Sequence, residues 1–227
     1  MAGLGSRFAE AGYDKPKPLI DVDGEPMIKR VVDSLGIDGN YIFIVQKEHS
    51  VKYHLQDVLD EIAPGCKIVE IDGLTDGAAR TTLAAKNLID NDTPLLIANS
   101  DQVIVWDSSA ISSIVASWDV VALFLAHESK WSYSKIEDSF ITEIAEKKVI
   151  SEFANVGIYG WSKGSDYVKY AEQMIAKGIK TNNEFYIAPV YNEAIADGKK
   201  VYPFFVDKMY GVGTPEDLEK YLNDKER

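Results

Sequence analysis

The chain has 227 residues, with 24 lysines and arginines against 36 aspartates and glutamates, which gives a net charge of −12. This acidic balance, without a basic patch or tail, argues against a nucleic acid as partner. The single cysteine excludes an internal disulfide and predicts a cytoplasmic location. No apolar run approaches membrane-spanning length and no signal peptide is visible, so we expect no membrane partner.

Strands and helices alternate through the first half of the chain. Apolar runs such as 41–45 and 94–98 are typical of strands buried on both faces. Pro26 lies at the first turn of one predicted helix, and Ser50 can cap another that runs to Ile62. The predicted strands are 19–22, 41–45, 67–71, 94–98 and 119–126, and the predicted helices are 26–35, 50–62 and 77–89. This alternation predicts an α/β fold with a mostly parallel, open and doubly wound sheet.

The pattern changes after about residue 130. Two predicted strands flank a turn at 137–139, and helices and strands follow in a less regular order. The predicted strands are 133–136, 140–145, 155–161 and 200–206, and the predicted helices are 162–177, the second part of 183–197 and 215–222. Strands added after an alternating half are expected of an added lobe that binds a substrate. Because no repeat or linker is visible, we predict one domain over 1–227, with 1–130 mainly its core and 131–227 mainly this lobe.

The opening segment combines two glycines with two cations. Gly3 and Gly5 lack a Cβ, so the backbone N–H groups around them can approach an anion closely. Arg7 adds a guanidinium fork, and Lys17 adds an ammonium group between two prolines that restrict the backbone. A Walker loop and the third glycine of a dinucleotide fingerprint are both absent. The segment therefore suits a polyphosphate held by another kind of loop.

This segment resembles the signature of the sugar-phosphate nucleotidyltransferases, Gly-x-Gly-x-Arg followed by Pro-Lys-Pro-Leu. The matching residues are Gly3, Gly5, Arg7, Pro16, Lys17, Pro18 and Leu19, and 24–28 match as well. In that family the glycine loop and the arginine hold the triphosphate, and the lysine stabilises charge at the reacting α-phosphate. The resemblance implies catalytic roles for Arg7 and Lys17. It implies nucleotide contacts from Ala2, Gly3, Leu4, Gly5 and Ser6, and a fold of the GT-A type with a nucleotide-binding core. In the family a first core strand precedes the loop, and that strand is missing before Met1.

A candidate metal ligand lies just past the end of the predicted strand 94–98. Asp101 follows Asn99 and Ser100 there, and ligands of open α/β sheets bind outside the carboxyl ends of the strands. A carboxylate at this position can hold Mg²⁺ against phosphate oxygens. The family has its first metal aspartate at this strand end, and we expect nucleotide contacts from Asn99 and Ser100. The alternative for Asp101 is a helix cap or a turn.

A second metal ligand is less well defined. The family usually continues from an aromatic residue into Asp-x-Gly-Thr-Pro, whose aspartate binds metal. The matching string here is 210–215, in which Gly211 stands in place of that aspartate. Asp207, at the end of the predicted strand 200–206, is the nearest carboxylate that can replace it. An aspartate in a surface turn is the alternative.

Small residues open the predicted helix 77–89. Gly77 and Ala78 resemble the family's Gly-Thr-Ala or Gly-Leu-Ala string, which reads the nucleobase, and Arg80 is a weaker candidate for the same role. Backbone groups beside such small residues can meet the edge and face of a base. Tight packing of the helix against a strand is the alternative for the alanines.

The acceptor candidates lie in the second half. Glu146-Lys147 resembles the first two residues of the family's Glu-Lys-Pro, in which the glutamate meets sugar hydroxyls and the lysine positions the sugar phosphate. Gly157 belongs to a further segment, 156–159, that the family shares. Asn183 and Glu184 carry polar groups that can bind sugar hydroxyls, and a helix cap is the alternative for Asn183.

The resemblance implies transfer of a nucleotidyl group from an NTP to a phosphorylated sugar or alcohol, with release of pyrophosphate and with Mg²⁺ as cofactor. We expect a sugar 1-phosphate as acceptor, and the sequence allows a homo-oligomer. One alternative is a GT-A-type glycosyltransferase, which normally lacks the glycine loop and carries an Asp-x-Asp that is absent here. Another is a non-catalytic homologue that binds nucleotide sugars, which Gly211 and the missing first strand favour.

Overall fold

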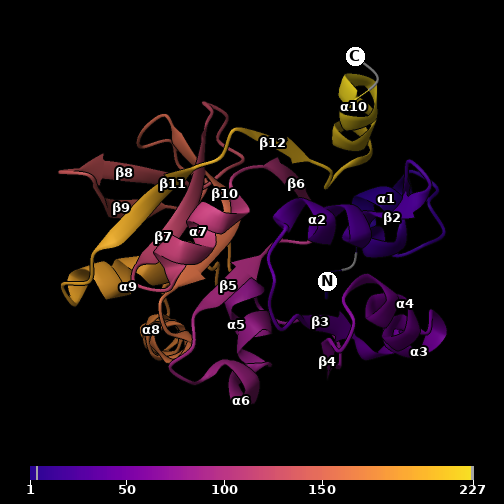
Figure 1. The fold of residues 1–227 in the computed structure, drawn as a ribbon, viewed down its shortest axis with the longest axis horizontal. Coiled ribbons are helices and arrows are strands. Elements are labelled where there is room, and N and C mark those ends of the chain that lie inside the picture. The colour runs from indigo at the N-terminus through magenta and orange to yellow at the C-terminus, as the bar shows by residue number, and fades with distance from the viewer. Residues whose placement is uncertain (4, 226–227) are drawn as a thin grey trace. The chain divides into compact units, whose positions relative to one another are not determined.

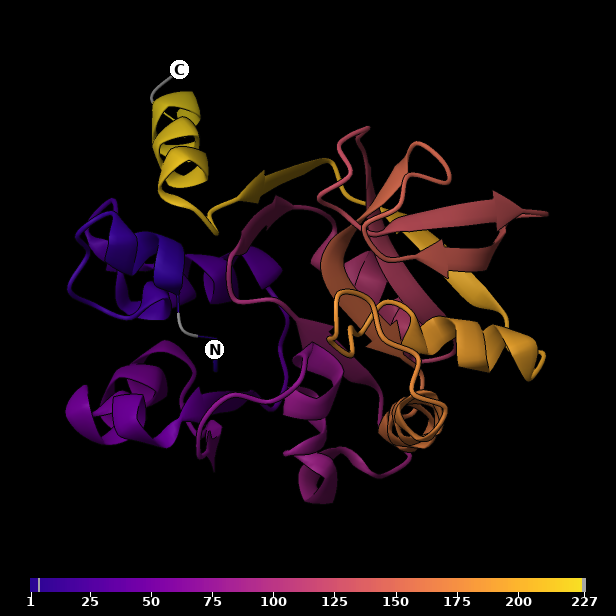
Figure 2. The same ribbon diagram turned by 180° about the vertical axis from the view of Figure 1, so that it is seen from behind.

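A computed structural model describes residues 1–3 and 5–225 of the chain. Contacts between residues divide it into two compact units (Figures 1 and 2). The first unit is formed by 1–74, 99–106 and 208–227, and the second by 75–98 and 107–207. Two short segments from the later chain thus join the N-terminal segment in the first unit.

The first unit holds short strands and helices around an apolar core. β3 and β4 pair in parallel, whereas β6 and β12 form an antiparallel pair, as do β1 and β2. The elements are α1 (Ser6–Glu10), the 3₁₀ helix η1 (Lys17–Leu19), β1 (Asp21–Val22), β2 (Glu25–Pro26), α2 (Met27–Leu35), β3 (Ile42–Gln46), α3 (Lys47–Lys52), α4 (Leu55–Ile62), β4 (Lys67–Ile71), β6 (Gln102–Val105), β12 (Lys208–Gly211) and α10 (Pro215–Lys225). Phe8, Val45, Leu59, Val103 and Val212 all contribute to this core. Residues of all three chain segments therefore share it.

The second unit is built on a six-stranded sheet in the order β5-β10-β7-β11-β9-β8. α7 covers the sheet face turned to the viewer in Figure 1, and α9 lies on the face seen in Figure 2. The elements are α5 (Ala78–Leu83), α6 (Lys86–Ile89), β5 (Leu95–Ala98), α7 (Ser108–Val115), β7 (Asp119–Leu125), β8 (Tyr133–Glu137), β9 (Phe140–Ala145), β10 (Phe153–Trp161), α8 (Gly164–Ala176), α9 (Val190–Ala196) and β11 (Val201–Phe205). Buried aromatic residues such as Trp161 and Tyr191, whose rings stack with centroids 4.2 Å apart, fill the space between the sheet and its helices.

The α/β class is confirmed, but the expectation of a mostly parallel sheet needs correction. Only β3–β4 and β7–β11 pair in parallel among the described strands, and the other pairs are antiparallel. The long strand β10 is the main cause, since it runs antiparallel to both β5 and β7. A continuous apolar run indicates burial on both faces of a strand, and it carries no information about direction.

Two predicted helices are each split in the structure. The predicted helix 50–62 is divided into α3 and α4 because His54 adopts a left-handed conformation, with φ of 48°. The predicted helix 77–89 is divided into α5 and α6 at Ala84 and Ala85. None of the described helices has the length and apolar character needed to cross a membrane.

Candidate active site

Lys17 and Asp101 form an ion pair in the first unit. Lys17 Nζ lies 2.7 Å from Asp101 Oδ2, although the two residues are 84 positions apart in the sequence. Their side chains are 22% and 21% exposed, so both charged groups are accessible to a ligand. Lys17 begins η1 and Asp101 immediately precedes β6, so two short elements set the geometry. The structure thus brings together the predicted catalytic lysine and the predicted metal aspartate.

Gly5 packs directly against Lys17. Its φ is +63°, a left-handed conformation that favours glycine, and an added Cβ would lie 3.1 Å from Lys17 Cβ. The carbonyl of Gly5 also accepts the Phe8 N–H at 3.0 Å at the start of α1, where Ser6 is exposed. Gly3 is exposed, and an added Cβ there would meet nothing within 4 Å, so the space beside it is open. Leu4 lies outside the described residues.

The start of the glycine loop is held by Gln46, a buried residue that the sequence did not single out. Gln46 Nε2 donates to the Ala2 carbonyl at 2.7 Å and to the Gly73 carbonyl at 3.0 Å. Ala2 itself is buried. A glutamine that ends an apolar strand was the available signal, because a buried amide needs hydrogen-bond partners.

Arg7 is exposed and forms no ion pair with any of the residues that the structure describes. Hydrogen bonds from the backbone N–H of Glu216 and from Thr214, together with the charge of Arg7, hold the pKa of Glu216 below its ordinary value. Arg7 therefore faces the start of α10 within the first unit. Its guanidinium group stays available to an anion.

The segment that resembles Asp-x-Gly-Thr-Pro lies against Asp101. The Val212 N–H donates to the Asp101 carbonyl at 2.8 Å, and a Cβ added to Gly213 would come within 2.7 Å of Asp101 Oδ2. In the β6–β12 ladder, Gly211 lies opposite Gln102, the residue after Asp101. The position that the family gives to an aspartate is therefore beside Asp101, and here it lacks a side chain.

Asp207, the carboxylate expected to replace the missing aspartate, is the last residue of the second unit. Lys208 lies opposite Val105, which is the end of the ladder away from Asp101, and Asp207 precedes Lys208. The role of Asp207 as a metal ligand stays a prediction. The sequence did not predict the strand β12, which follows Asp207 directly.

The donors around Asp101 fit a hard cation that arrives with a polyphosphate. Within the described part of the chain, no group of three or more His, Cys, Asp or Glu residues could hold a metal ion by itself. Mg²⁺ commonly takes one or two protein carboxylates and completes its shell with phosphate oxygens and water. Asp101 supplies one such carboxylate, and the partly exposed Ser100 and exposed Asn99 precede it at the end of β5.

In the second unit Gly77 is held against the backbone of Phe185. Its φ is +128°, and an added Cβ would lie 2.4 Å from both the nitrogen and the oxygen of Phe185. Tight backbone packing therefore explains why glycine is needed here. Ala78 is exposed and remains open to a ligand. Arg80 is engaged elsewhere, since its Nε lies 2.5 Å from Asp76 Oδ1.

Several residues predicted to bind the acceptor substrate lie near Tyr186. Lys147 has a left-handed backbone with φ of 54°, and its Nζ donates to Tyr186 Oη at 2.5 Å. Burial raises the pKa of Glu146 to about 7, an effect that Lys147 opposes and Glu184 reinforces. Glu146, Lys147 and Glu184 are thus electrostatic neighbours although they come from separate segments. No hydrogen bond or ion pair of Glu146 is found among the described residues, so its carboxyl group is open to a donor.

Asn183 and Gly157 have conformational roles. Asn182 and Asn183 both have positive φ in a tight turn closed by Thr181 and Glu184, whose N–H groups bond each other's carbonyls at 3.0 and 2.9 Å. The helix-cap alternative for Asn183 is wrong, because α9 begins only at Val190. Gly157 is buried, with φ of +92°, where the register between β10 and β7 shifts.

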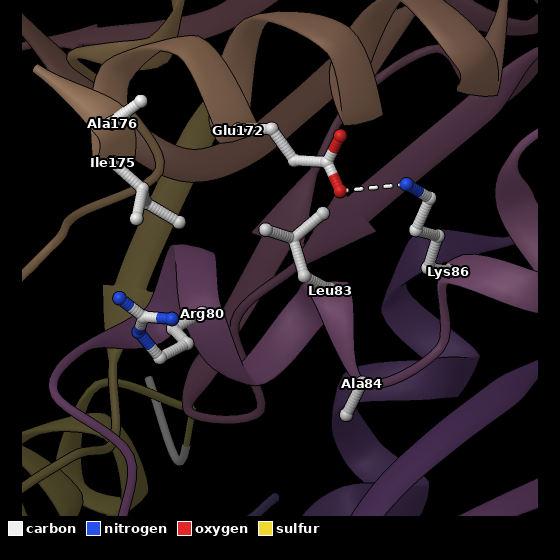
Figure 3. A pocket seen from close by; sticks show the side chains of 7 residues that line it. All are labelled: Arg80, Leu83, Ala84, Lys86, Glu172, Ile175 and Ala176. Carbon is white, nitrogen blue, oxygen red and sulfur yellow. Dashed lines mark hydrogen bonds and ion pairs between the residues drawn. The ribbon is translucent and has the colours of Figure 1, made fainter.

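A separate pocket of about 410 Å³ lies beside α5, α6 and α8 (Figure 3). Leu83 and Ile175 give it apolar walls, and the Lys86–Glu172 ion pair, 2.6 Å long, lies along its side. Apart from the weaker candidate Arg80, it contains none of the residues predicted for the site. We therefore distinguish it from the site described above.

Comparison with known proteins decides the family. The family model described as Nucleotidyl transferase matches residues 1–227. The chain belongs to this family. The resemblance noted from the glycine loop is thus confirmed over the whole chain.

Two curated relatives show how far the likeness extends. The Bifunctional protein GlmU of Methanocaldococcus jannaschii is 24% identical over 232 residues, which cover 99% of this chain and 53% of the relative. The protein of the same name from Methanococcus maripaludis is 29% identical over 168 residues, or 70% of this chain and 38% of the relative. The chain therefore spans about half the length of the first relative, and it matches a smaller share of the second.

Solved structures share the fold. A nucleoside-diphosphate-sugar pyrophosphorylase from Vibrio cholerae superimposes with a TM-score of 0.84 at 24% identity, covering 98% of both chains. A UDP-glucose pyrophosphorylase complexed with UDP-glucose gives a TM-score of 0.75 at 19% identity, covering 100% of this chain and 97% of the other. At these identities the likeness establishes the fold, and the predicted fold type is confirmed.

Proposed function

We propose that this nucleotidyltransferase joins an NTP to a sugar 1-phosphate. A phosphate oxygen of the acceptor attacks the α-phosphorus, the bond from that phosphorus to the bridging oxygen of the β-phosphate breaks, and pyrophosphate leaves with the electron pair. Supporting observations are the family assignment and the pyrophosphorylase names of two proteins that share the fold. A phosphorylated alcohol is the alternative acceptor.

The Lys17–Asp101 ion pair is the observation that carries this proposal. It unites the lysine of one family-like motif with the strand-end carboxylate of another at 2.7 Å, beside the glycine loop. Gly5 packs against the lysine and Gly213 against the carboxylate. The absence of a side chain at Gly211 leaves this arrangement intact.

The reaction requires positioning and charge neutralisation more than covalent chemistry. In the proposed mechanism, Lys17 places its ammonium group at the α-phosphate, where negative charge increases in the transition state. Arg7 and the N–H groups of the glycine loop hold the leaving phosphates. Asp101 would hold Mg²⁺, which supplies further neutralisation of phosphate oxygens when bound.

Residues of the second unit are proposed to bind the base and the acceptor. Ala78 is exposed beside Gly77 and can approach a base. Glu146 and Glu184 are acceptors for sugar hydroxyls, and Lys147 offers an ammonium group to the acceptor phosphate. A Glu146 pKa of about 7 means that this carboxyl group is only partly ionised at neutral pH. It can then act both as donor and as acceptor toward a hydroxyl.

A pyrophosphate-release assay tests the function. Each of the four NTPs is combined with a panel of sugar 1-phosphates and with phosphocholine, in the presence of Mg²⁺. We expect release with one NTP and one acceptor well above all other pairs, and loss of release after chelation of divalent metal. A glycosyltransferase would instead release a nucleoside diphosphate from a nucleotide sugar. A protein that binds nucleotide sugars without any turnover would contradict the proposal.

A further inference from the structure

We propose that Phe185 is a positioning residue that joins the base-contact segment to the acceptor-contact segment of the second unit. Its backbone and its ring together hold residues 76–80, while its chain neighbours Glu184 and Tyr186 belong to the proposed acceptor site. The inference deepens the proposed function and rests on it for what the two segments bind. The sequence pattern gave no sign of this role.

The backbone of Phe185 brackets Gly77 on both sides. The Phe185 N–H donates to the Asp76 carbonyl at 2.8 Å, and the Ala79 N–H donates to the Phe185 carbonyl at 2.9 Å. Between these two hydrogen bonds an added Cβ on Gly77 would come within 2.4 Å of Phe185 nitrogen and oxygen. Cβ atoms in real proteins do not approach backbone atoms this closely. The backbone of Phe185 also cannot move aside as the end of a flexible side chain could. Only glycine therefore allows this contact.

The ring of Phe185 is held by two cations that share one carboxylate. The Asp76 carboxylate lies 2.9 Å from Lys180 Nζ and 2.5 Å from Arg80 Nε. Lys180 Nζ is 4.5 Å from the centre of the Phe185 ring, and Arg80 Cζ is 5.4 Å from it. Both distances are within the range of cation–π attraction. The ring is 3% exposed, so the two cations and the carboxylate cover a buried side chain.

The residues on either side of Phe185 are constrained as well. Glu184 closes the tight turn 181–184, and Tyr186 Oη accepts the hydrogen bond from Lys147 Nζ. Ala78, the exposed base-contact candidate, lies between Gly77 and Ala79, which are both held by Phe185. Any displacement of Phe185 must therefore shift Ala78 together with Glu184. We infer that the nucleobase and the acceptor are oriented by one connected piece of backbone.

The first test introduces a side chain into the contact. Gly77→Ala is compared with Gly198→Ala, since Gly198 has a similar left-handed strain, with φ of +84°, but open space where a Cβ would go. We measure amide hydrogen exchange of the peptides around 76–81 and 183–187, and KM for both substrates. Gly77→Ala should speed exchange in both peptides and raise both KM values by about tenfold. Gly198→Ala should leave the exchange of both peptides unchanged.

The second test loosens the contact without a clash, in case Gly77→Ala fails to fold. Lys180→Met removes the bond to Asp76, and Lys169→Met is its matched control. Lys169 also pairs with an aspartate, Asp197, at 2.8 Å and also lies 4.5 Å from the centre of a ring, that of Tyr170. Lys180→Met should speed exchange in both peptides and raise both KM values about threefold, with kcat changed less. Lys169→Met should change neither KM.

Exchange that increases in only one of the two peptides would overturn the proposal, as would a change in KM for one substrate alone. A loss of thermal stability with both KM values unchanged would reduce Phe185 to a structural residue and would also overturn it. A wild-type protein without pyrophosphate release would reject the proposed function. The exchange measurements would then still decide whether the two segments move together.

Discussion

The two compact units hold their candidate site residues in different ways. In the first unit the essential contact is between side chains, Lys17 and Asp101, and the neighbouring Gly5 and Gly213 leave room for it. In the second unit the backbone of Phe185 fixes Gly77 through two hydrogen bonds. An incoming anion or cation can rearrange paired charges, whereas it cannot easily displace hydrogen-bonded backbone. The first unit is therefore suited to respond to charge, and the second to fix shape.

The largest expected effect comes from removing the charge in the first unit. Lys17→Ala should lower kcat by roughly 10²-fold or more while NTP affinity changes much less, because its charge acts where the α-phosphate gains negative charge. Steady-state pyrophosphate release and NTP titration measure the two quantities. Lys15→Ala, at an exposed lysine of the same loop, serves as control. Equal losses in kcat and affinity would indicate ordinary ground-state binding instead.

A smaller effect is expected from crowding the same ion pair. A Cβ on Gly213 would lie 2.7 Å from Asp101 Oδ2, so Gly213→Ala should turn that carboxylate and lower kcat by about tenfold. Gly39→Ala is the control, because its added Cβ would make only an ordinary contact at 3.8 Å with Ile37. Pyrophosphate release at saturating substrate compares them. A fully active Gly213→Ala variant would mean that this glycine does not set the position of Asp101.

Glu146 in the second unit should make stability depend on pH. Burial raises its pKa from 4.5 to about 7, so between these values the folded state keeps a proton that the unfolded state has lost. Its contribution to stability is therefore present below about pH 4.5 and is lost as the pH rises through about 7. At pH 8, Glu146→Gln should raise the free energy of unfolding by on the order of 2 kcal/mol, and Tm should rise with it. At pH 4.5 both quantities should change little. Thermal denaturation at both pH values tests this, and equal shifts at both would contradict it.

The smallest expected effect is at Asp207. This exposed residue lies beyond the far end of the β6–β12 ladder from Asp101, so Asp207→Ala should leave the Mg²⁺ dependence of the rate nearly unchanged. Gly211→Asp adds a carboxylate beside Asp101 and should lower the Mg²⁺ concentration needed for half-maximal rate. Metal titrations of both variants give the comparison. A marked increase in the Mg²⁺ requirement of Asp207→Ala would restore it as a ligand.

The sequence predicted the first unit's contact better than its surroundings. Lys17 and Asp101 were assigned to one site from separate motifs, and the structure brings them together. The β6–β12 pair beside this contact was not predicted because each strand has only four residues, and Lys208 and Gly211 leave β12 with little apolar pattern. Such short strands leave little periodicity to detect.

The second unit shows a different limit of sequence reading. Gly77 was recognised as a residue that permits close approach, but its partner was not, because Phe185 acts through its N–H and carbonyl groups. Every residue except proline carries both of these groups, so no side-chain pattern reports their use. The antiparallel direction of strands such as β10 was not predicted for a related reason. A hydrophobic run indicates that a strand is buried, and it does not indicate whether the strand runs parallel or antiparallel to its neighbours.

The buried Gln46 amide has a consequence that depends on a single atom. Its nitrogen donates to the carbonyls of Ala2 and Gly73, one at the start of the glycine loop and the other two residues before the chain enters the second unit. Exchanging that nitrogen for oxygen, as in Gln46→Glu, would keep the shape of the side chain yet replace both attractions with repulsion between oxygens. The start of the glycine loop and the chain at Gly73 would then be released together.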